Sequence, residues 1–332
     1  MMRAATVCLV AFVLTGCSTG NPVSVSTDAQ TASPSTTGDV PAPVTALSSP
    51  DTTTTTPVVD WPGPCGHPSG AAPPSYDHVI WIWMENKNLD AVLDSSSAPF
   101  LRSLAESCGT AVRYVDHGIH PSLPNYLAAT SGGTQGVADD SSPSVHALPT
   151  DNVFRQVRAL GKVAKSYEEA MPANCTLRST SRYAVKHNPA AYYVGGDDRA
   201  ACQRDNVPFD QFLPDLSGGL PAFSLITPDI CNDMHDCPVA TGDKWLNDAV
   251  SAIIASATYR EGRTAVFVVF DESEGGGTTP FVAIAPSIVP GTRVATELDH
   301  YSLLAFTEDA LGVPTRLGSA ATAPSMADAF GL

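Results

Sequence analysis

Short, unbroken hydrophobic runs are separated by polar stretches in the second part of this chain. Residues 78–84 (HVIWIWM) and 264–270 (TAVFVVF) are rich in β-branched and aromatic side chains. Runs of this kind are typical of strands that are buried on both faces. Further strands are expected at the following positions: 110–115, 162–167, 222–227 and 280–285.

Segments with the apolar spacing of helices lie between these runs. They are predicted at the following positions: 99–107, 123–130, 151–160, 243–256 and 300–311. Asp151 is placed to cap a helix, and Gly161 and Gly312 are placed to end one. Because the apolar strands alternate with helices, the pattern predicts a layered α/β/α fold with a mostly parallel central sheet.

The first residues have a different pattern. A basic residue, Arg3, precedes a short apolar run that ends in Leu14-Thr15-Gly16-Cys17. The run is too short to span a bilayer and is typical of a secretory signal. Its ending resembles a bacterial lipobox, so residues 1–17 are expected to direct export and Cys17 to be lipidated. An ordinary signal peptide with an incidental cysteine is the alternative.

Residues 18–74 are dominated by Thr, Ser, Pro, Ala and Val and contain few large apolar side chains. Such a segment cannot bury enough surface to fold, so it is expected to be a disordered tether. The globular domain is then predicted to span 75–332, although Trp61 and Cys65 near the end of the tether are expected to belong to it. The expected location is the outer side of the cell membrane, facing the extracellular or periplasmic space.

The chain carries a formal net charge of −16. Nucleic-acid binding requires basic patches, so a nucleic-acid partner is not expected. The charge also disfavours adhesion to anionic lipids without an acyl anchor.

Six cysteines remain outside the signal and the lipobox, an even number in a chain expected to be exported. They are Cys65, Cys108, Cys175, Cys202, Cys231 and Cys237. Three disulfides are therefore predicted, and sequence alone allows 15 pairings. We favour pairing of nearest neighbours. A zinc site is the alternative, but no Cys-x-x-Cys pair is present.

The segment His120-Pro121-Ser122-Leu123-Pro124-Asn125-Tyr126 places a serine between two prolines and before an apolar run. Pro124 is placed to be the first residue of a helix, so the Ser122 hydroxyl is expected near the positive end of that helix. A hydroxyl beside an anion site is what a phosphoryl-transfer nucleophile requires. The alternative interpretation is a serine that only caps the helix.

Polar residues follow the two strongest strand runs. Glu85-Asn86 comes after the first and Asp271-Glu272 after the second. Ligands of open α/β sheets bind beyond the carboxyl ends of the strands, and hard oxygen donors suit a divalent cation. The pattern therefore predicts a shared metal site. Carboxylates that merely end strands and face water are the alternative.

Three histidines lie in polar surroundings: His187 in KHNP, His235 in NDMHD and His300 after Asp299. Imidazole can protonate a leaving oxygen or bind phosphate. A lone histidine is more often structural, so each residue alone is a weak signal.

Five motifs of this chain occur in the order found in the bacterial phosphoesterase family: MEN, HPSLPNY, KHNP, NDMHD and FDESEGG. The chain resembles this family from about residue 76 to residue 332. That family includes acid phosphatases and phospholipases C and is related to the alkaline phosphatase-like superfamily. The resemblance implies an alkaline phosphatase-like fold and one divalent metal ion of unknown identity. It implies Ser122 as nucleophile, and His187 and His235 in phosphate binding or acid–base chemistry. The implied metal ligands are Glu85, Asn86, Ser122, Asp271 and Glu272, and Asn125, Asp236 and His300 are expected to bind substrate.

The compact chain is more similar to the acid phosphatase branch than to the longer phospholipases C. The expected reaction is hydrolysis of small phosphomonoesters through a phosphoserine. Phospholipase C action on lipid headgroups and a non-catalytic binding lipoprotein are the alternatives. A serine esterase is disfavoured because the folded region has no Gly-x-Ser-x-Gly.

Overall fold

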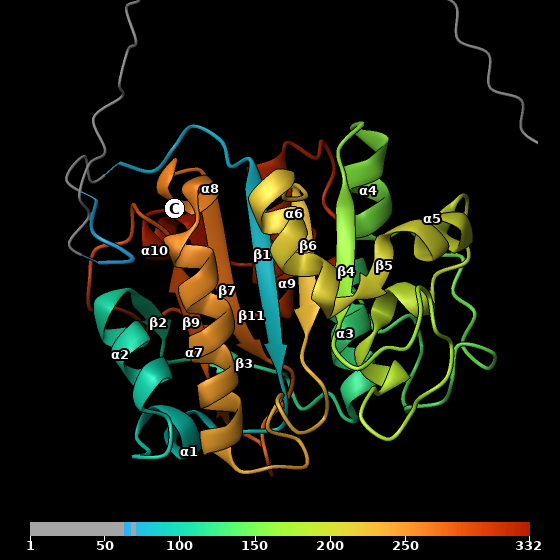
Figure 1. The fold of residues 1–332 in the computed structure, drawn as a ribbon, viewed down its shortest axis with the longest axis horizontal. Helices are drawn as coiled ribbons and strands as arrows, with labels where there is room; N and C mark the ends of the chain where they lie inside the picture. Colours follow the sequence, from blue (N-terminus) through green and yellow to red (C-terminus); the bar gives the residue numbers. More distant parts are fainter. Residues whose placement is uncertain (1–62, 68–70) are drawn as a thin grey trace, which may run out of the picture. The chain divides into compact units, whose positions relative to one another are not determined.

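The computed structural model describes residues 63–67 and 71–332 (Figure 1). The predicted signal, Cys17 and most of the predicted tether lie outside the described residues. None of the helices in the described part is long and apolar enough to cross a membrane.

An eight-stranded sheet forms the centre of the fold, in the order β10-β2-β9-β7-β1-β6-β4-β5 (Figure 1). All neighbouring strands are parallel except β9, which runs antiparallel to both β7 and β2. The mostly parallel sheet predicted from the sequence is therefore confirmed. The strands are β1 (His78–Met84), β2 (Gly109–Ala111), β4 (Ala164–Glu168), β5 (Asn206–Pro208), β6 (Phe223–Thr227), β7 (Thr264–Phe270), β9 (Phe281–Ile284) and β10 (Thr292–Val294).

The central strands are apolar because both faces of the sheet are covered. α7 lies in front of the sheet in the view of Figure 1 and α9 lies behind it, so the layers are α/β/α. α7 packs against α2, and α9 packs against α3, α4, α10 and β1. The helices are α1 (Leu89–Leu93), α2 (Pro99–Ser107), α3 (Ser122–Ser131), α4 (Val153–Ala159), α5 (Asp198–Asp205), α6 (Phe212–Gly218), α7 (Val239–Ala255), α8 (Ala257–Arg260), α9 (His300–Leu311) and α10 (Met326–Phe330). The 3₁₀ turns are η1 (Val185–His187), η2 (Pro189–Ala191), η3 (Phe209–Gln211) and η4 (Gly318–Thr322).

The predicted strand at 110–115 is divided between two sheets. Its first part is β2, and its second part, β3 (Tyr114–Val115), joins a small sheet with β8 (Thr278–Thr279) and β11 (Leu298–Asp299). The exposed Arg113 lies in the turn between the two parts and pairs with Glu297 at 2.7 Å. The chain thus passes from the large sheet to the small sheet at Arg113, the one charged residue of the predicted strand.

All three predicted disulfides are present, with nearest neighbours paired: Cys65–Cys108, Cys175–Cys202 and Cys231–Cys237. The six thiols are thus unavailable for the alternative zinc site. The first bond fixes residues 63–67 to the domain, where Gly66 N–H also donates to Ile288 O at 2.9 Å and His67 N–H to Pro286 O at 2.8 Å. The predicted domain start at residue 75 is therefore too late, while the expectation that Cys65 belongs to the domain agrees with this bond.

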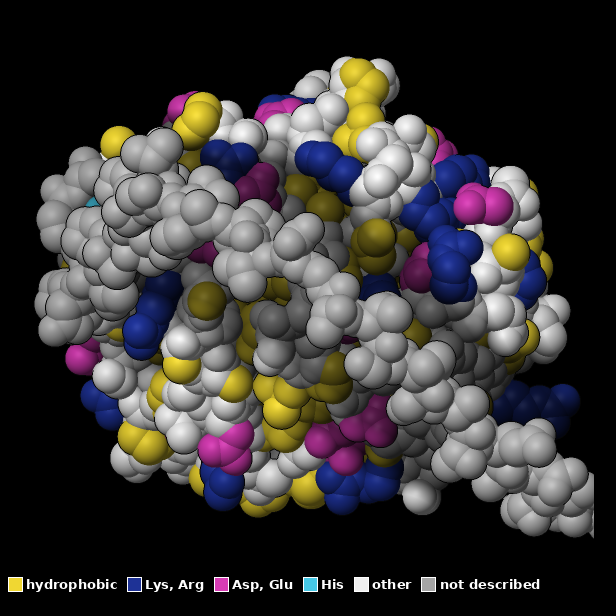
Figure 2. Space-filling view, turned by 45° about the horizontal axis from the view of Figure 1, so that its top comes forward, with side chains coloured by type: hydrophobic (Ala, Val, Ile, Leu, Met, Phe, Trp, Pro, Cys, Tyr) yellow, Lys and Arg dark blue, Asp and Glu magenta, His cyan; other side chains and the backbone are white. Residues whose placement is uncertain are grey.

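On the face shown in Figure 2, Lys and Arg side chains lie among Asp and Glu side chains rather than in one continuous patch. Ion pairs also reach buried carboxylates of the domain: Arg155 and Arg158 both pair with the buried Asp198.

Glu168 is a buried carboxyl outside the sites that the sequence predicts, at the end of β4. Burial raises its pKa from 4.5 to about 8, although hydrogen bonds from Ser166, Thr227 and Asn206 act in the opposite direction. Between these two values the folded protein holds a proton that the unfolded chain has lost. The free energy of unfolding must then fall as pH rises, with a slope approaching about 1.4 kcal/mol per pH unit.

Glu168→Gln removes this titration while keeping a side chain of similar shape. We expect the substitution to flatten the fall in unfolding free energy between pH 5 and pH 8. The free energy of unfolding of the variant should therefore rise relative to that of the wild type as pH rises. Urea denaturation of both proteins across this range measures the difference. Parallel curves for the two proteins would show that Glu168 does not titrate in the folded state as described.

Candidate active site

The polar residues that follow β1 and β7 lie side by side, because these strands are parallel neighbours with Met84 opposite Phe270. Glu85 and Asp271 are both fully buried. Asn86 N–H donates to Asp271 Oδ1 at 2.9 Å. The Asn86 amide lies against the same carboxylates: its nitrogen, when turned toward them, is 3.1 Å from Asp271 Oδ1 and 3.3 Å from Glu85 Oε2. These two strand ends therefore meet, as the sequence predicts.

Ser122 joins this group from the first turn of α3. Its side chain is buried, and its hydroxyl donates to Glu85 Oε2 at 3.1 Å. Pro121 occupies the capping position and makes no capping hydrogen bond, and the Leu123 N–H of the first turn donates to Asp140 Oδ1 at 3.0 Å. The alternative interpretation of Ser122 as a mere cap is therefore wrong, because its hydroxyl points to the carboxylate group instead of the helix backbone.

His187 lies between two carboxylates, within η1. Its Nε2 is 3.2 Å from Glu85 Oε2 and its Nδ1 is 3.3 Å from Asp233 Oδ2. Neither nitrogen has hydrogen-bond geometry to a partner, and Asp233 Oδ2 also lacks one. Burial lowers the pKa of His187 to about 3. The ring is thus neutral at pH 7, the form that binds a metal ion rather than the form that donates a proton.

His235 lies in the short loop closed by Cys231–Cys237. Its backbone N–H donates to Asp233 Oδ1 at 2.7 Å, and its Nδ1 is 2.6 Å from Asp236 Oδ1. Its ring centroid is 5.7 Å from that of His187. Its side chain is 28% exposed, whereas that of His187 is 1% exposed. His235 is therefore the histidine of this pair that a substrate can reach.

Asp233 was not among the residues predicted from the sequence. Its backbone oxygen accepts from Glu85 N–H at 2.8 Å, so the 231–237 loop is attached directly to the end of β1. Burial raises the pKa of Asp233 to about 8. The NDMHD motif contains the residue, but the sequence analysis singled out only His235 and Asp236 in it.

The cluster has the properties of a cation site. Burial, together with the charges of Asp271 and Asp233, raises the pKa of Glu85 well above its ordinary value. Ligand atoms of Glu85, His187 and His235 all lie within 4.8 Å of one another. Crowded buried carboxylates and imidazole nitrogens without hydrogen-bond partners fit a divalent cation.

Glu272 makes its side-chain contacts with the segment that carries Ser122. Its Oε2 accepts from Asn125 Nδ2 at 3.1 Å and lies 2.9 Å from His120 Nδ1. Burial and the nearby Asp271 charge raise its pKa to about 7. Glu272 therefore contacts the His120–Asn125 segment in this structure rather than Glu85, Asn86 or Ser122.

Two residues expected to bind substrate make hydrogen bonds within the site. Asn125 is buried and donates to Ile119 O at 2.8 Å as well as to Glu272. His300 is 2% exposed, with Nδ1 3.0 Å from Tyr114 Oη and Nε2 2.7 Å from Asp271 O. Asn125 Oδ1 has no hydrogen-bond partner, whereas both ring nitrogens of His300 have protein partners. Substrate binding by the two residues stays a prediction. Asp236 is exposed but directed at His235.

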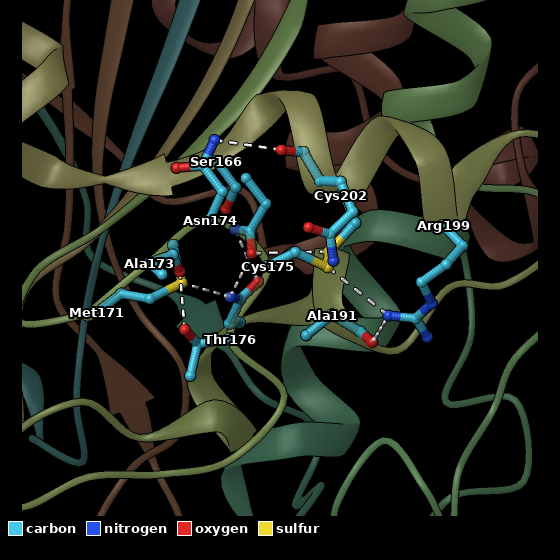
Figure 3. The surroundings of a disulfide bond; sticks show 12 residues. Ser166, Met171, Ala173, Asn174, Cys175, Thr176, Ala191, Arg199 and Cys202 are labelled. Atoms are coloured by element: carbon cyan, nitrogen blue, oxygen red, sulfur yellow. Dashed lines mark hydrogen bonds between the residues drawn. A yellow bond between two sulfur atoms is a disulfide. The ribbon is translucent and has the colours of Figure 1, made fainter. Parts of the chain in front are cut away.

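A covalent and hydrogen-bonded network holds the segment that carries His187. Asn188 exchanges side-chain hydrogen bonds with Asn206 at 2.9 and 3.1 Å, and Cys175 N–H donates to Asn206 O. Figure 3 shows Cys175 bonded to Cys202, with Arg199 reaching from α5 to Ala191. The Cys175–Cys202 bond thus stabilises the network that holds η1 and η2.

Comparison with known sequences relates residues 81–314 to the Phosphoesterase family. A phosphatidylinositol-3-phosphatase of Mycobacterium tuberculosis is 33% identical over 268 residues, which is 79% of this chain and 86% of that protein. A probable acid phosphatase of Kluyveromyces lactis is 30% identical over 254 residues, 70% of this chain. The match spans 58% of that yeast protein, less than two thirds of its length.

Comparison with solved structures shows the alkaline phosphatase-like fold. A protein of the alkaline phosphatase superfamily from Vibrio parahaemolyticus superimposes with a TM-score of 0.54 at 12% identity, covering 78% of this chain and 73% of that one. A lipoteichoic acid synthase from Listeria monocytogenes gives 0.52 at 10% identity, with 73% and 74% covered. The predicted fold is therefore confirmed.

Proposed function

This chain belongs to the phosphoesterase family, and from that premise we propose that it hydrolyses phosphomonoesters through a covalent phosphoserine at Ser122. The observation that supports this most directly is the position of the Ser122 hydroxyl. It is 3.1 Å from Glu85 Oε2, at the first turn of α3 and within a cluster of buried carboxylates. A hydroxyl held there has an acceptor for its hydrogen and a helix end that favours an anion.

Each proton transfer in the proposed reaction is assigned to a side chain of the site. Glu85 accepts the Ser122 hydrogen, so that Oγ attacks phosphorus as the bond to the leaving oxygen breaks. His235 gives a proton to that oxygen, and Asp236 orients its ring through Nδ1. Water then attacks the phosphoserine and loses a proton to His235, while Ser122 Oγ recovers its hydrogen from Glu85. This sequence regenerates the starting residues and releases inorganic phosphate.

A divalent cation would be held by Glu85, Asn86, Asp271 and Ser122, with His187 as a further donor close to Glu85. When bound, it would lower the pKa of the serine hydroxyl and stabilise charge on the phosphoryl oxygens. His187 suits a ligand better than the acid–base role expected from the sequence, since its ring is neutral and buried. Glu272, whose Oε2 contacts His120 and Asn125, would be a further oxygen donor.

A phosphomonoester on a lipid headgroup is a second candidate substrate. The name of the mycobacterial relative favours it. An anchor at Cys17, which stays a prediction because it lies outside the described residues, would place the domain beside such substrates on the outer side of the membrane.

The test is a metal-supplemented assay of the purified protein with p-nitrophenyl phosphate and p-nitrophenylphosphorylcholine. We expect faster hydrolysis of the phosphomonoester and a requirement for one divalent cation per chain by elemental analysis. Preference for the choline ester would favour the phospholipase C alternative. No hydrolysis of either compound with any divalent metal would favour a non-catalytic binding protein.

A further inference from the structure

Lys186 is a partly exposed lysine next to His187, and the mechanism above does not use it. It precedes His187 in η1, and its Nζ is 3.0 Å from Asp140 Oδ2. The other oxygen of Asp140 accepts from Leu123 N–H at 3.0 Å. Asp140 therefore joins the lysine to the first turn of α3, one residue from the Ser122 hydroxyl.

The side chains of this pair are partly accessible, with 23% of Lys186 and 28% of Asp140 exposed. Burial lowers the pKa of Lys186, but the charges of Asp140, Glu85 and Asp271 more than offset it, and the pKa is raised overall. The same carboxylates that surround Ser122 thus act on this ammonium group. Asp140 also acts electrostatically on His187 and Glu272.

The site has more acidic groups than permanent cations. Glu85, Asp233, Asp271 and Glu272 are buried acidic residues of the site. His120, which pairs with Glu272, is charged only when protonated. Two lysines lie close to this group among the described residues. Lys87 Nζ donates to Asn86 O at 2.9 Å and pairs with Glu274, whereas Lys186 is joined by Asp140 to the start of α3, next to Ser122.

We propose that Lys186 binds the phosphoryl group of the substrate and selects phosphomonoesters over phosphodiesters. A monoester carries close to two negative charges at neutral pH, whereas a diester carries one. The attraction between an ammonium and a phosphate grows with the phosphate charge, so Lys186 stabilises the monoester more. Asp140 is a positioning residue that holds the ammonium beside the start of α3. This inference rests on the function proposed above and names the substrate class that the site prefers.

The test compares the wild type with Lys186→Met on p-nitrophenyl phosphate and bis-p-nitrophenyl phosphate, which share a leaving group. Removing one charge-assisted contact is expected to lower kcat/KM roughly 30-fold for the monoester and no more than about 3-fold for the diester. Inhibition constants for inorganic phosphate and dimethyl phosphate give the same comparison without turnover. We expect the constant for inorganic phosphate to rise roughly 10-fold and that for dimethyl phosphate to change little.

Lys165→Met is the matched control. Lys165 also forms a partly exposed ion pair, at 2.6 Å from Asp215, with 21% and 25% of the two side chains exposed. Lys165 lies near the N-terminal end of β4, whereas the site lies beyond the C-terminal ends of the parallel strands. We expect this variant to keep the wild-type kcat/KM on both substrates. If Lys186→Met unfolds, Lys186→Gln and the charge-preserving Lys186→Arg take its place, and only the neutral variant should lose monoester preference.

The outcomes separate this inference from the proposed function. A wild-type protein inactive on both esters overturns the proposed function and the role of Lys186 with it. An active wild type whose Lys186 variants lose monoester and diester activity by the same factor overturns only the selection by Lys186. Unchanged activity and unchanged phosphate inhibition in Lys186→Met would overturn it as well.

Discussion

Ser122→Ala is expected to lower kcat on p-nitrophenyl phosphate by at least about 10³-fold, the scale of effect seen when a covalent nucleophile is removed. The hydroxyl that would form the bond to phosphorus is lost, while α3 keeps its start at Pro121 and its buried apolar side. The measurement is steady-state turnover at saturating substrate and metal. Rapid acid quenching of the wild type during turnover should also trap phosphate on a peptide that contains Ser122, and the variant should trap none.

Ser131→Ala is the control for this substitution, because Ser131 is a buried serine at the other end of the same helix. Its hydroxyl donates to Leu127 O at 2.7 Å and takes no part in the site. The expected loss is about 1 kcal/mol of unfolding free energy, with turnover unchanged. Full activity in Ser122→Ala, with trapped phosphate on another residue, would show that the nucleophile lies elsewhere.

Glu85→Gln is expected to reduce kcat/KM by at least about 100-fold and to abolish stabilisation by the metal. Glu85 accepts from both Ser122 and Tyr126, and its neighbours Asp233 and Asp271 are also acidic. A neutral amide cannot balance the charge of a divalent cation. In the wild type, a cation at 100 times its Kd should add about 2.7 kcal/mol to the free energy of unfolding. For a domain of this size, that corresponds to a rise in Tm of roughly 5–10 °C.

The measurement is the Tm of each protein, first treated with chelator and then titrated with one divalent cation at a time. Glu308→Gln is the control, because Glu308 is another buried glutamate, located on α9 and bonded to Leu317 N–H at 2.8 Å. It should keep both the metal-dependent shift and the activity. A full metal-dependent shift in Glu85→Gln would place the cation outside the described carboxylate cluster.

The sequence predicted most of the framework because hydrophobic runs determine which strands are central. β1 and β7 have the predicted bounds, and their parallel pairing follows from burial on both faces. The approach of Glu85 to Asp271 then follows from strand geometry. The position of Ser122 was also predictable, since two prolines fix the start of α3.

Other parts of the site depend on contacts that leave no periodic signal. Lys186 and Asp140 come from a 3₁₀ turn and a loop, and only the folded chain brings them together. His300 resembles a functional residue by its place after Asp299, but the packing of α9 behind β1 turns its ring toward the backbone of Asp271. Helix α5 was not predicted, because its sequence DRAACQRD is mostly polar and it is held by its disulfide and by arginine pairs.

The bond between Cys65 and Cys108 determines where a mechanical load would enter the domain. A pull applied to the chain ahead of residue 63 reaches Cys65 first and passes through the sulfur bridge to the end of α2. Strand β1, which carries Glu85 at its far end, begins 13 residues after Cys65 and lies beyond that bridge. Tension on the N-terminal side would therefore pass through this buried bond to the junction of α2 and β2, and β1, which ends at the candidate active site, would not be drawn out of register.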